Sequence, residues 1–390
     1  MNAEFCRRIR LSIVKFVVNT GLVLLSFALS VTMLEVGVRL LTPYPNHLPR
    51  SNQVKDEQLG YRLVGGSFET NSVGFRAPER VRNADIVAIG DSHTFGGNVG
   101  AADAWPNALS RNTGLSFYNF GVPGYNIIQY RRLLGAAFAL KPKIIVIANY
   151  AYNDFESFCS DYVSMKSASI NAEEPRWLCA GRPEKKGMIA EPFGLRSLAL
   201  VGAARDILRR VRNMSPRVPG VGLPDDAIFR VTDYGIEASF VLADRSAYYT
   251  RLSEQRPDRE DTILYFDDLL RTFRLAAVKS NTRVIMATIP SKDLVYSRYL
   301  SGGGVQVPAQ IDQLVKYETD WQNLARHAAR KNLVEVCELE EPLVDALRAG
   351  TRIYKRYDNS HPGILGYAVY ANAIAKCIDS ESVHQIGELE

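Results

Sequence analysis

A short apolar run that ends in Gly-Asp-Ser constrains this chain more than any other feature of its sequence. Residues 86–89, Ile-Val-Ala-Ile, are typical of a buried strand, and Gly90, Asp91 and Ser92 follow at once. Gly90 permits a tight turn that a Cβ would obstruct. Because open α/β sheets bind ligands at the carboxyl ends of their strands, the pattern predicts Ser92 at such an edge. An ordinary loop serine would show the same local pattern.

A second polar segment, residues 357–362, changes this interpretation. Asp358 and His361 lie three residues apart there, in a turn-prone stretch before Pro362. This spacing lets Asp358 accept a hydrogen bond from one imidazole nitrogen, which leaves the other free to take the proton of Ser92. The other histidines are predicted to be structural or solvent-facing: His93, expected to point elsewhere on the turn, and His47, His327 and His384.

From residue 86 onward, strand patterns alternate with helix patterns. Strands are predicted at 86–90, 115–120, 144–148, 283–289 and 333–336, and helices near 102–112, 126–140, 260–279, 308–330 and 364–378. This alternation predicts a parallel sheet between layers of helices. The interval 156–260 is too long for a bare loop in a compact domain and is predicted to be an inserted cap region.

The N-terminus carries an uncharged apolar run, residues 16–34. As a helix this run would be about 28 Å long, close to the hydrocarbon thickness of a bilayer, and it predicts a transmembrane helix. The basic residues before it predict a cytoplasmic N-terminus and a remainder outside the inner membrane: Arg7, Arg8, Arg10 and Lys15. A cleaved signal peptide is the alternative, although no clear small-residue cleavage motif follows.

Four cysteines would then face an oxidising compartment, and they allow three pairings. Cys159 with Cys179 is the most local pair, and we predict that it forms a disulfide. Cys337, at the end of a strand, and Cys377, on the last helix, could also meet. Free buried thiols are the alternative.

Composition and motifs argue against several classes of function. The chain is 46% hydrophobic and 23% charged, which fits an ordinary globular core. Its net charge of +5 is scattered, so no nucleic-acid partner is predicted. The glycines of residues 96–100 lack dinucleotide-loop spacing and no Walker lysine follows. Without a Cys-x-x-Cys or a histidine cluster, neither a metal nor another cofactor is predicted.

Four blocks, taken together and in order, resemble the SGNH (GDSL-type) hydrolase family. They are Gly90-Asp91-Ser92, residues 119–124 (Asn-Phe-Gly-Val-Pro-Gly), Asn153-Asp154, and Asp358 with His361-Pro362. The resemblance covers about residues 84–378 and implies a flavodoxin-like strand order. The implied divisions are a basic tip with the transmembrane helix (1–41), a linker with an N-terminal segment (42–83), the hydrolase domain (84–380) and a tail (381–390).

The same resemblance implies a role for each site residue. Ser92 would be the nucleophile, His361 its base and Asp358 the carboxylate that orients the base. The oxyanion would be held by the backbone N–H groups of Ser92 and Gly124 and by the amide of Asn153, with Gly121 as the alternative second backbone donor. One residue departs from the family pattern, because Ala151 stands where the third block usually has glycine.

The function implied is that of a membrane-anchored extracytoplasmic serine esterase that cleaves carboxylic O-acyl esters. Two alternatives stay open: an O-acyltransferase that modifies an envelope or secreted polysaccharide, and a non-catalytic carbohydrate- or protein-binding module. The partners implied are an acyl-ester substrate, a polysaccharide, the membrane through residues 16–34, and envelope-biosynthesis proteins.

Residues 70–76, Thr-Asn-Ser-Val-Gly-Phe-Arg, predict a turn between short extended pieces. Similar segments often precede the serine block in membrane-anchored members of the family, but nothing in the pattern explains its role.

Overall fold

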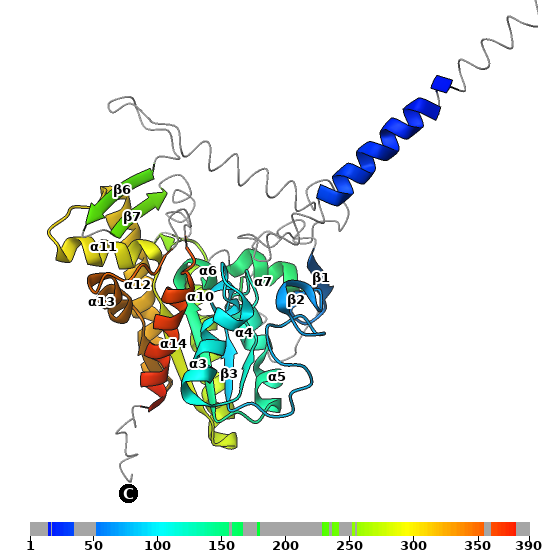
Figure 1. The fold of residues 1–390 in the computed structure, drawn as a ribbon. Coiled ribbons are helices and arrows are strands. Elements are labelled where there is room, and N and C mark those ends of the chain that lie inside the picture. The colour runs from blue at the N-terminus through cyan, green and yellow to red at the C-terminus, as the bar shows by residue number, and fades with distance from the viewer. Residues whose placement is uncertain are drawn as a thin grey trace, which may run out of the picture. The chain divides into compact units, whose positions relative to one another are not determined.

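The computed structural model describes ten stretches of the chain (Figure 1). They are residues 15–16, 18–34, 52–155, 158–166, 178–179, 228–233, 236–241, 252–253, 256–354 and 360–379. The chain divides into two compact units, one formed by residues 1–51 and 191–217 and the other by residues 52–190 and 218–390.

In the first unit the described residues, 15–16 and 18–34, are helical. They include most of the predicted membrane span, and their large apolar side chains are exposed, among them Phe16, Leu25 and Met33. Within the stretches that the structure describes, no helix combines the length and the apolarity that crossing a bilayer requires, so the predicted transmembrane helix is not found there.

The second unit is built on one parallel sheet of five strands in the order β4-β3-β5-β8-β9. The strands are β3 (Ile86–Ile89), β4 (Phe117–Asn119), β5 (Ile144–Tyr150), β8 (Arg283–Ile289) and β9 (Glu335–Glu338). In chain order this is 2-1-3-4-5, the flavodoxin-like arrangement, so the predicted α/β fold is confirmed. The chain leaves β3 for β4 on one side and returns to β5 on the other, so the strand order reverses at β3, and open α/β sheets bind ligands at the carboxyl ends of strands at such a point.

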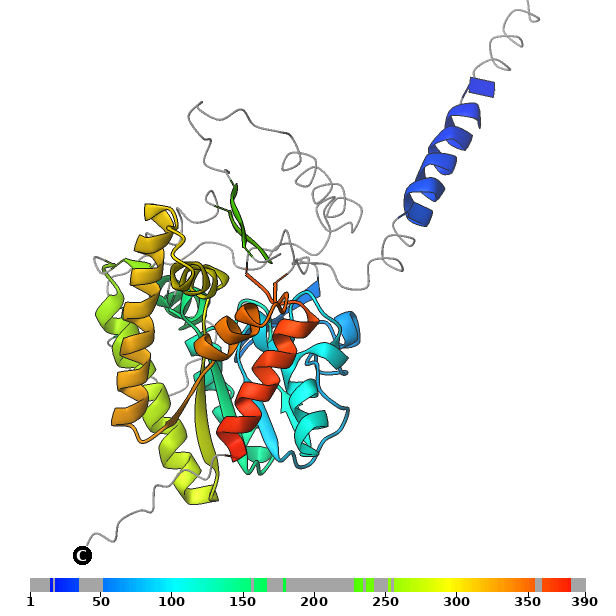
Figure 2. The same cartoon turned by 60° about the vertical axis from the view of Figure 1, so that its left-hand side comes forward.

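Helices cover both faces of the sheet (Figure 2). On one side α3 (Trp105–Thr113) packs against α14 (Ile364–Asp379), and on the other α10 (Arg259–Ser280) packs against α12 (Ala309–Lys331) and α4 (Ile127–Arg132). Every residue of β3 and β5 is buried between these layers. Continuous apolar strands are expected where both faces of a parallel sheet are covered.

The predicted elements differ from the observed ones mainly at their ends. The sequence predicts the fifth strand at 333–336, but this strand begins at Glu335, because Leu333 adopts a left-handed φ of 54° at the end of α12. The predicted helix 126–140 is two helices, α4 and α5 (Leu134–Ala139), on either side of Leu133.

Several elements were not predicted at all. They are the short helices α2 (Ser92–Phe95) and α6 (Ala151–Asp154), the helices α7 (Phe158–Lys166), α11 (Lys292–Gly302) and α13 (Glu340–Arg348), and the hairpins β1–β2 (Gln53–Asp56, Gly60–Leu63) and β6–β7 (Ile228–Asp233, Ile236–Val241). Of the predicted inserted region 156–260, the described residues include α7 and the β6–β7 hairpin.

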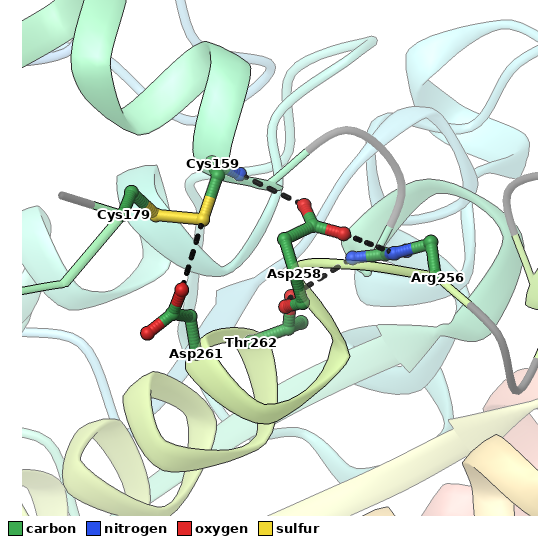
Figure 3. Close-up of a disulfide and its surroundings, with 6 residues drawn as sticks. All are labelled: Cys159, Cys179, Arg256, Asp258, Asp261 and Thr262. Carbon is green, nitrogen blue, oxygen red and sulfur yellow. Dashed lines mark hydrogen bonds and ion pairs between the residues drawn. A yellow bond between two sulfur atoms is a disulfide. The ribbon is translucent and has the colours of Figure 1, made fainter. Parts of the chain in front are cut away.

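Both disulfides considered from the sequence are present. Cys337 of β9 is bonded to Cys377 of α14, and the predicted Cys159–Cys179 bond joins α7 to residue 179. Figure 3 shows the Asp258 carboxylate beside the second bond, where it accepts from the backbone N–H of Cys159 and pairs with Arg256.

The Cys159–Cys179 bond lies next to the segment that follows the third block. Arg256 also donates to the carbonyl of Phe155, one residue after α6. The bond and this arginine therefore hold the chain immediately after Asn153. Asp261 lies near both sulfurs, but disulfide sulfurs offer no thiolate to a metal ion.

A buried carboxyl closes the loop at the carboxyl end of β8. Glu318 of α12 is fully buried and accepts from the backbone N–H and the hydroxyl of Ser291, which caps α11. Burial raises the pKa of Glu318 from 4.5 to about 8, and the nearby charge of Asp293 adds to the increase.

We expect Glu318→Gln to become increasingly more stable than the native chain between pH 5 and pH 8. Folded Glu318 keeps its proton up to about pH 8, whereas the unfolded chain loses it near the ordinary value of 4.5. Folding therefore takes up a proton in this window, and the native chain loses roughly a few kcal/mol as the pH rises through it. Thermal unfolding of both proteins across this range measures the difference. A difference independent of pH would contradict the assignment.

Candidate active site

Ser92 and His361, 269 residues apart in the sequence, meet at the carboxyl edge of the sheet. Ser92 begins α2 directly after β3, and its Oγ lies 2.7 Å from Nε2 of His361. His361 lies three residues before the start of α14, in a segment tied to the fold by a bridge between Tyr354 and Pro362. Because α14 packs on α3 beside the sheet, the segment just before α14 places the His361 imidazole near the carboxyl end of β3.

The second nitrogen of His361 determines which tautomer can act as a base. Its Nδ1 lies 3.0 Å from the Ser360 hydroxyl. For Nε2 to accept the proton of Ser92, Nδ1 must carry the hydrogen, and the Ser360 oxygen is then an acceptor. The predicted orienting residue, Asp358, lies outside the described residues, and Ser360 was not singled out from the sequence.

The loop after α2 holds the imidazole from one side. A Cβ on Gly97 would come within 2.8 Å of Cδ2 and 3.1 Å of Nε2 of His361, so only glycine leaves room for the ring. Asn98 donates from its side chain to the His361 carbonyl over 3.2 Å. From the sequence, Gly97 was considered only as part of a possible nucleotide-binding loop, so its steric role beside His361 was not predicted.

His93 packs against the other side of the base. Its ring is fully buried, with its centroid 4.8 Å from that of His361 and 4.2 Å from that of Tyr150. Burial, and then the charge of His361, hold the pKa of His93 well below its usual value, so His93 is neutral beside the base. The solvent-facing interpretation of His93 is therefore wrong, and its ring lies against His361 and does not point elsewhere on the turn. His327, on α12, is exposed, and His47 and His384 lie outside the described residues.

The predicted oxyanion donors follow three adjacent strands. Ser92 follows β3, Gly124 follows β4, and Asn153 lies in α6, directly after β5. Asn153 donates from its side chain to the carbonyl of Tyr125, which links the third block to the second. An amide has two N–H groups, so the second remains available for another acceptor. Ala151, buried at the start of α6, does not prevent this link.

The structure separates the two candidate backbone donors. The N–H of Gly121 donates to the Asn119 side chain over 2.7 Å, and a Cβ on Gly121 would come within 2.5 Å of the Phe95 nitrogen. Gly121 is therefore committed to packing against α2. Gly124 has a φ of +83°, a conformation that favours glycine, and its role as the backbone donor of this loop stays a prediction.

Two buried carboxyl groups bind the segments that carry Ser92 and Asn153. Asp91 caps α2 and accepts from the backbone N–H of His93 over 2.8 Å. Asp154 accepts from the Tyr130 hydroxyl, the Asn149 amide and the backbone N–H of Tyr150 over 2.7 to 2.8 Å. Burial raises the pKa of Asp91 to about 7, and burial and the charge of Asp91 raise that of Asp154 well above its usual value.

A serine hydroxyl within hydrogen-bond reach of an imidazole, at the carboxyl edge of a parallel α/β sheet, is an arrangement that serine hydrolases use. The comparisons with known proteins add a likeness to one family. Residues 88–255 match the model of the GDSL-like Lipase/Acylhydrolase family. This match covers less than half of the chain, so it shows a likeness to the GDSL/SGNH family, and the chain is an enzyme that acts on ester bonds. No curated protein matches the sequence at a significant level.

Solved structures show only distant likeness. A catalytic mutant of an acetylxylan esterase from Geobacillus stearothermophilus is 11% identical, with a TM-score of 0.38 over 76% of this chain and 94% of that chain. A G-D-S-L family lipolytic protein from Veillonella parvula is 12% identical, with a TM-score of 0.35 over 75% and 96%. An α/β hydrolase from the Lake Arreo metagenome is 13% identical, with a TM-score of 0.37 over 76% and 97%. With TM-scores this low, these likenesses carry no argument about the present chain.

Proposed function

We propose that this protein is a membrane-anchored serine esterase that cleaves carboxylic O-acyl esters outside the cytoplasm. The observation that carries the proposal is the 2.7 Å contact between Ser92 Oγ and His361 Nε2. This distance lies within hydrogen-bond reach for proton transfer, which a non-catalytic binding module would not require.

In the proposed mechanism His361 takes the proton of Ser92 as its oxygen attacks the ester carbonyl. The developing oxyanion is held by the backbone N–H groups of Ser92 and Gly124 and by the Asn153 amide. Collapse of the tetrahedral intermediate expels the alcohol, to which His361 returns the proton. Asp358 stabilises the imidazolium that forms in between. Water then attacks the acyl-enzyme, again with His361 as base, and releases the carboxylic acid.

Turnover of p-nitrophenyl acetate, butyrate and palmitate by the purified full chain tests this function. We expect burst kinetics or steady turnover that Ser92→Ala abolishes. Repeating the assay with an acetylatable polysaccharide distinguishes water from a sugar hydroxyl as the acceptor. If no ester is turned over and no serine reacts with a fluorophosphonate, the binding-module alternative replaces the esterase.

For the location, we expect alkaline phosphatase fused after Pro49 to be active. The basic residues before the apolar run 16–34 favour a cytoplasmic N-terminus. The two disulfides of the second unit further support an oxidising compartment. Phosphatase activity of the fusion in intact cells measures the orientation. A cytoplasmic reporter that is active at the same junction would reverse it.

A further inference from the structure

We propose that Arg76 is a positioning residue for the catalytic base: its guanidinium fixes the loop of residues 96–99 that holds His361 against Ser92. The inference rests on the proposed function of this pair. It also gives a physical role to residues 70–76, which lie outside the segment that matches the family model.

The turn at residues 70–76 is built to present Arg76. The Asn71 side chain accepts from the backbone N–H groups of Val73 and Phe75 over 3.2 and 3.0 Å, and its backbone N–H donates to the Phe75 carbonyl over 2.7 Å. Gly74 has a φ of +93°, and a Cβ there would come within 2.3 Å of the Leu63 carbonyl oxygen. Asparagine and glycine are therefore needed to close the turn immediately before Arg76.

Arg76 reaches the C-terminal end of α2, the helix that Ser92 begins, where backbone carbonyls lack helical partners. Its Nη1 donates to the carbonyls of Phe95, Gly96 and Val99 over 3.1, 3.0 and 3.0 Å. The guanidinium also lies over the Phe95 ring, 3.9 Å from its centroid. Arg76 is only 4% exposed, so these contacts are made away from water.

Two further contacts anchor the guanidinium itself. Nε donates to the carbonyl of Phe68 over 2.9 Å, and Nη2 lies 3.9 Å from a carboxylate oxygen of Glu69. The same Glu69 oxygen accepts from the backbone N–H of Ala101 over 2.6 Å. One buried cation thus ties the N-terminal segment to both ends of the loop 96–99. A planar guanidinium can serve these acceptors together, whereas a lysine ammonium has fewer donors and a different geometry.

The loop that Arg76 holds is the loop that contacts the base. Gly97 and Asn98 lie between the carbonyls of Gly96 and Val99, and these two residues pack against the ring and bind the carbonyl of His361. The backbone N–H groups of Gly96 and Gly97 also donate to the Ser92 carbonyl over 3.1 and 2.8 Å. Release of the loop would therefore loosen the imidazole and α2 together.

The test compares Arg76→Met and Arg76→Lys with Arg283→Met in the full chain. Arg283 is a matched control because it also donates to backbone carbonyls, those of Ile378 and Cys377, and pairs with a glutamate. It begins β8 and so lies at the opposite edge of the sheet from the site. Ester kinetics are measured well below the melting temperature of each variant.

We expect Arg76→Met to lower kcat about 10²-fold with KM changed less than about 3-fold, because misplacement by about 1 Å costs this much. Arg76→Lys should fall between it and the native chain, and Arg283→Met should keep the native kcat. Hydrogen exchange of the amides of residues 96–99 should quicken about 10-fold in Arg76→Met and stay native in Arg283→Met, as expected when a local contact is lost.

Each outcome decides between the inference and the proposed function. An active native chain with native kcat in Arg76→Met overturns the inference and leaves the esterase intact. Equal losses of kcat in Arg76→Met and Arg283→Met also overturn it, since they would indicate general destabilisation. If the native chain turns over no ester, the proposed function fails, and unchanged exchange in the loop would then overturn the positioning role by itself.

Discussion

Replacement of Ser92 or His361 by alanine is expected to lower kcat by about 10⁴-fold or more, and the double variant should lose little further. The two side chains form one proton-transfer unit across 2.7 Å, so removing either one removes its whole contribution. The remaining rate would come from substrate binding and the oxyanion donors, which neither substitution changes.

Ester turnover of the single and double variants, with enzyme concentration set by folded protein, measures this effect. A fluorophosphonate probe should label Ser92 in the native chain and no serine in Ser92→Ala. Ser360→Ala is a useful companion, because it removes the hydroxyl beside Nδ1 and keeps both members of the pair. Labelling that persists in Ser92→Ala, or native turnover in His361→Ala, would remove this pair from the mechanism.

Gly97→Ala is expected to lower kcat by about 10²–10³-fold through one added methyl group. Gly97 does not occupy the left-handed region that disfavours alanine, so the substitution strains the imidazole rather than the backbone. The new Cβ would meet Cδ2 of His361 at 2.8 Å, and the ring can avoid it only by moving relative to Ser92.

Gly135→Ala is the control for this substitution. Gly135 lies in α5, and apart from its chain neighbours and the backbone of its own helix no atom comes within 4 Å of its ideal Cβ position, so alanine there should raise stability by up to about 1 kcal/mol. Its kcat should equal that of the native chain. The rate of fluorophosphonate labelling should fall with kcat in Gly97→Ala. A Gly97→Ala enzyme within about 3-fold of native kcat would mean that His361 is not held tightly by this loop.

Local patterns in the sequence were sufficient to predict the central strands of the domain. The apolar runs at residues 86–89, 144–148 and 284–287 identify the three central strands, because a strand buried on both faces is largely apolar. The ends of elements were less predictable. The start of β9 depends on the left-handed conformation of Leu333, which no apolar pattern reports.

The buried pairings were predictable only in part. The short separation of Cys159 and Cys179 was enough to predict their bond, whereas Cys337 and Cys377 could only be proposed as neighbours. Their meeting depends on α14 packing behind β9, which is a property of the finished fold. The role of Asp358 and the membrane topology remain predictions.

The sequence by itself determined the parallel α/β frame and the chemical types at its edge: a serine after the first strand of the sheet and a histidine before the last helix. Chain order and residue chemistry carry that information, since the carboxyl ends of parallel strands share one edge. Only the tertiary structure decided what holds Ser92 and His361 at hydrogen-bond distance. Arg76 binds carbonyls 19 to 23 residues away, and Gly97 matters because of a ring that arrives from residue 361. In each of these contacts a side chain meets the backbone of a residue far away in the sequence, and because every residue has a backbone, no pattern of side chains predicts such a contact.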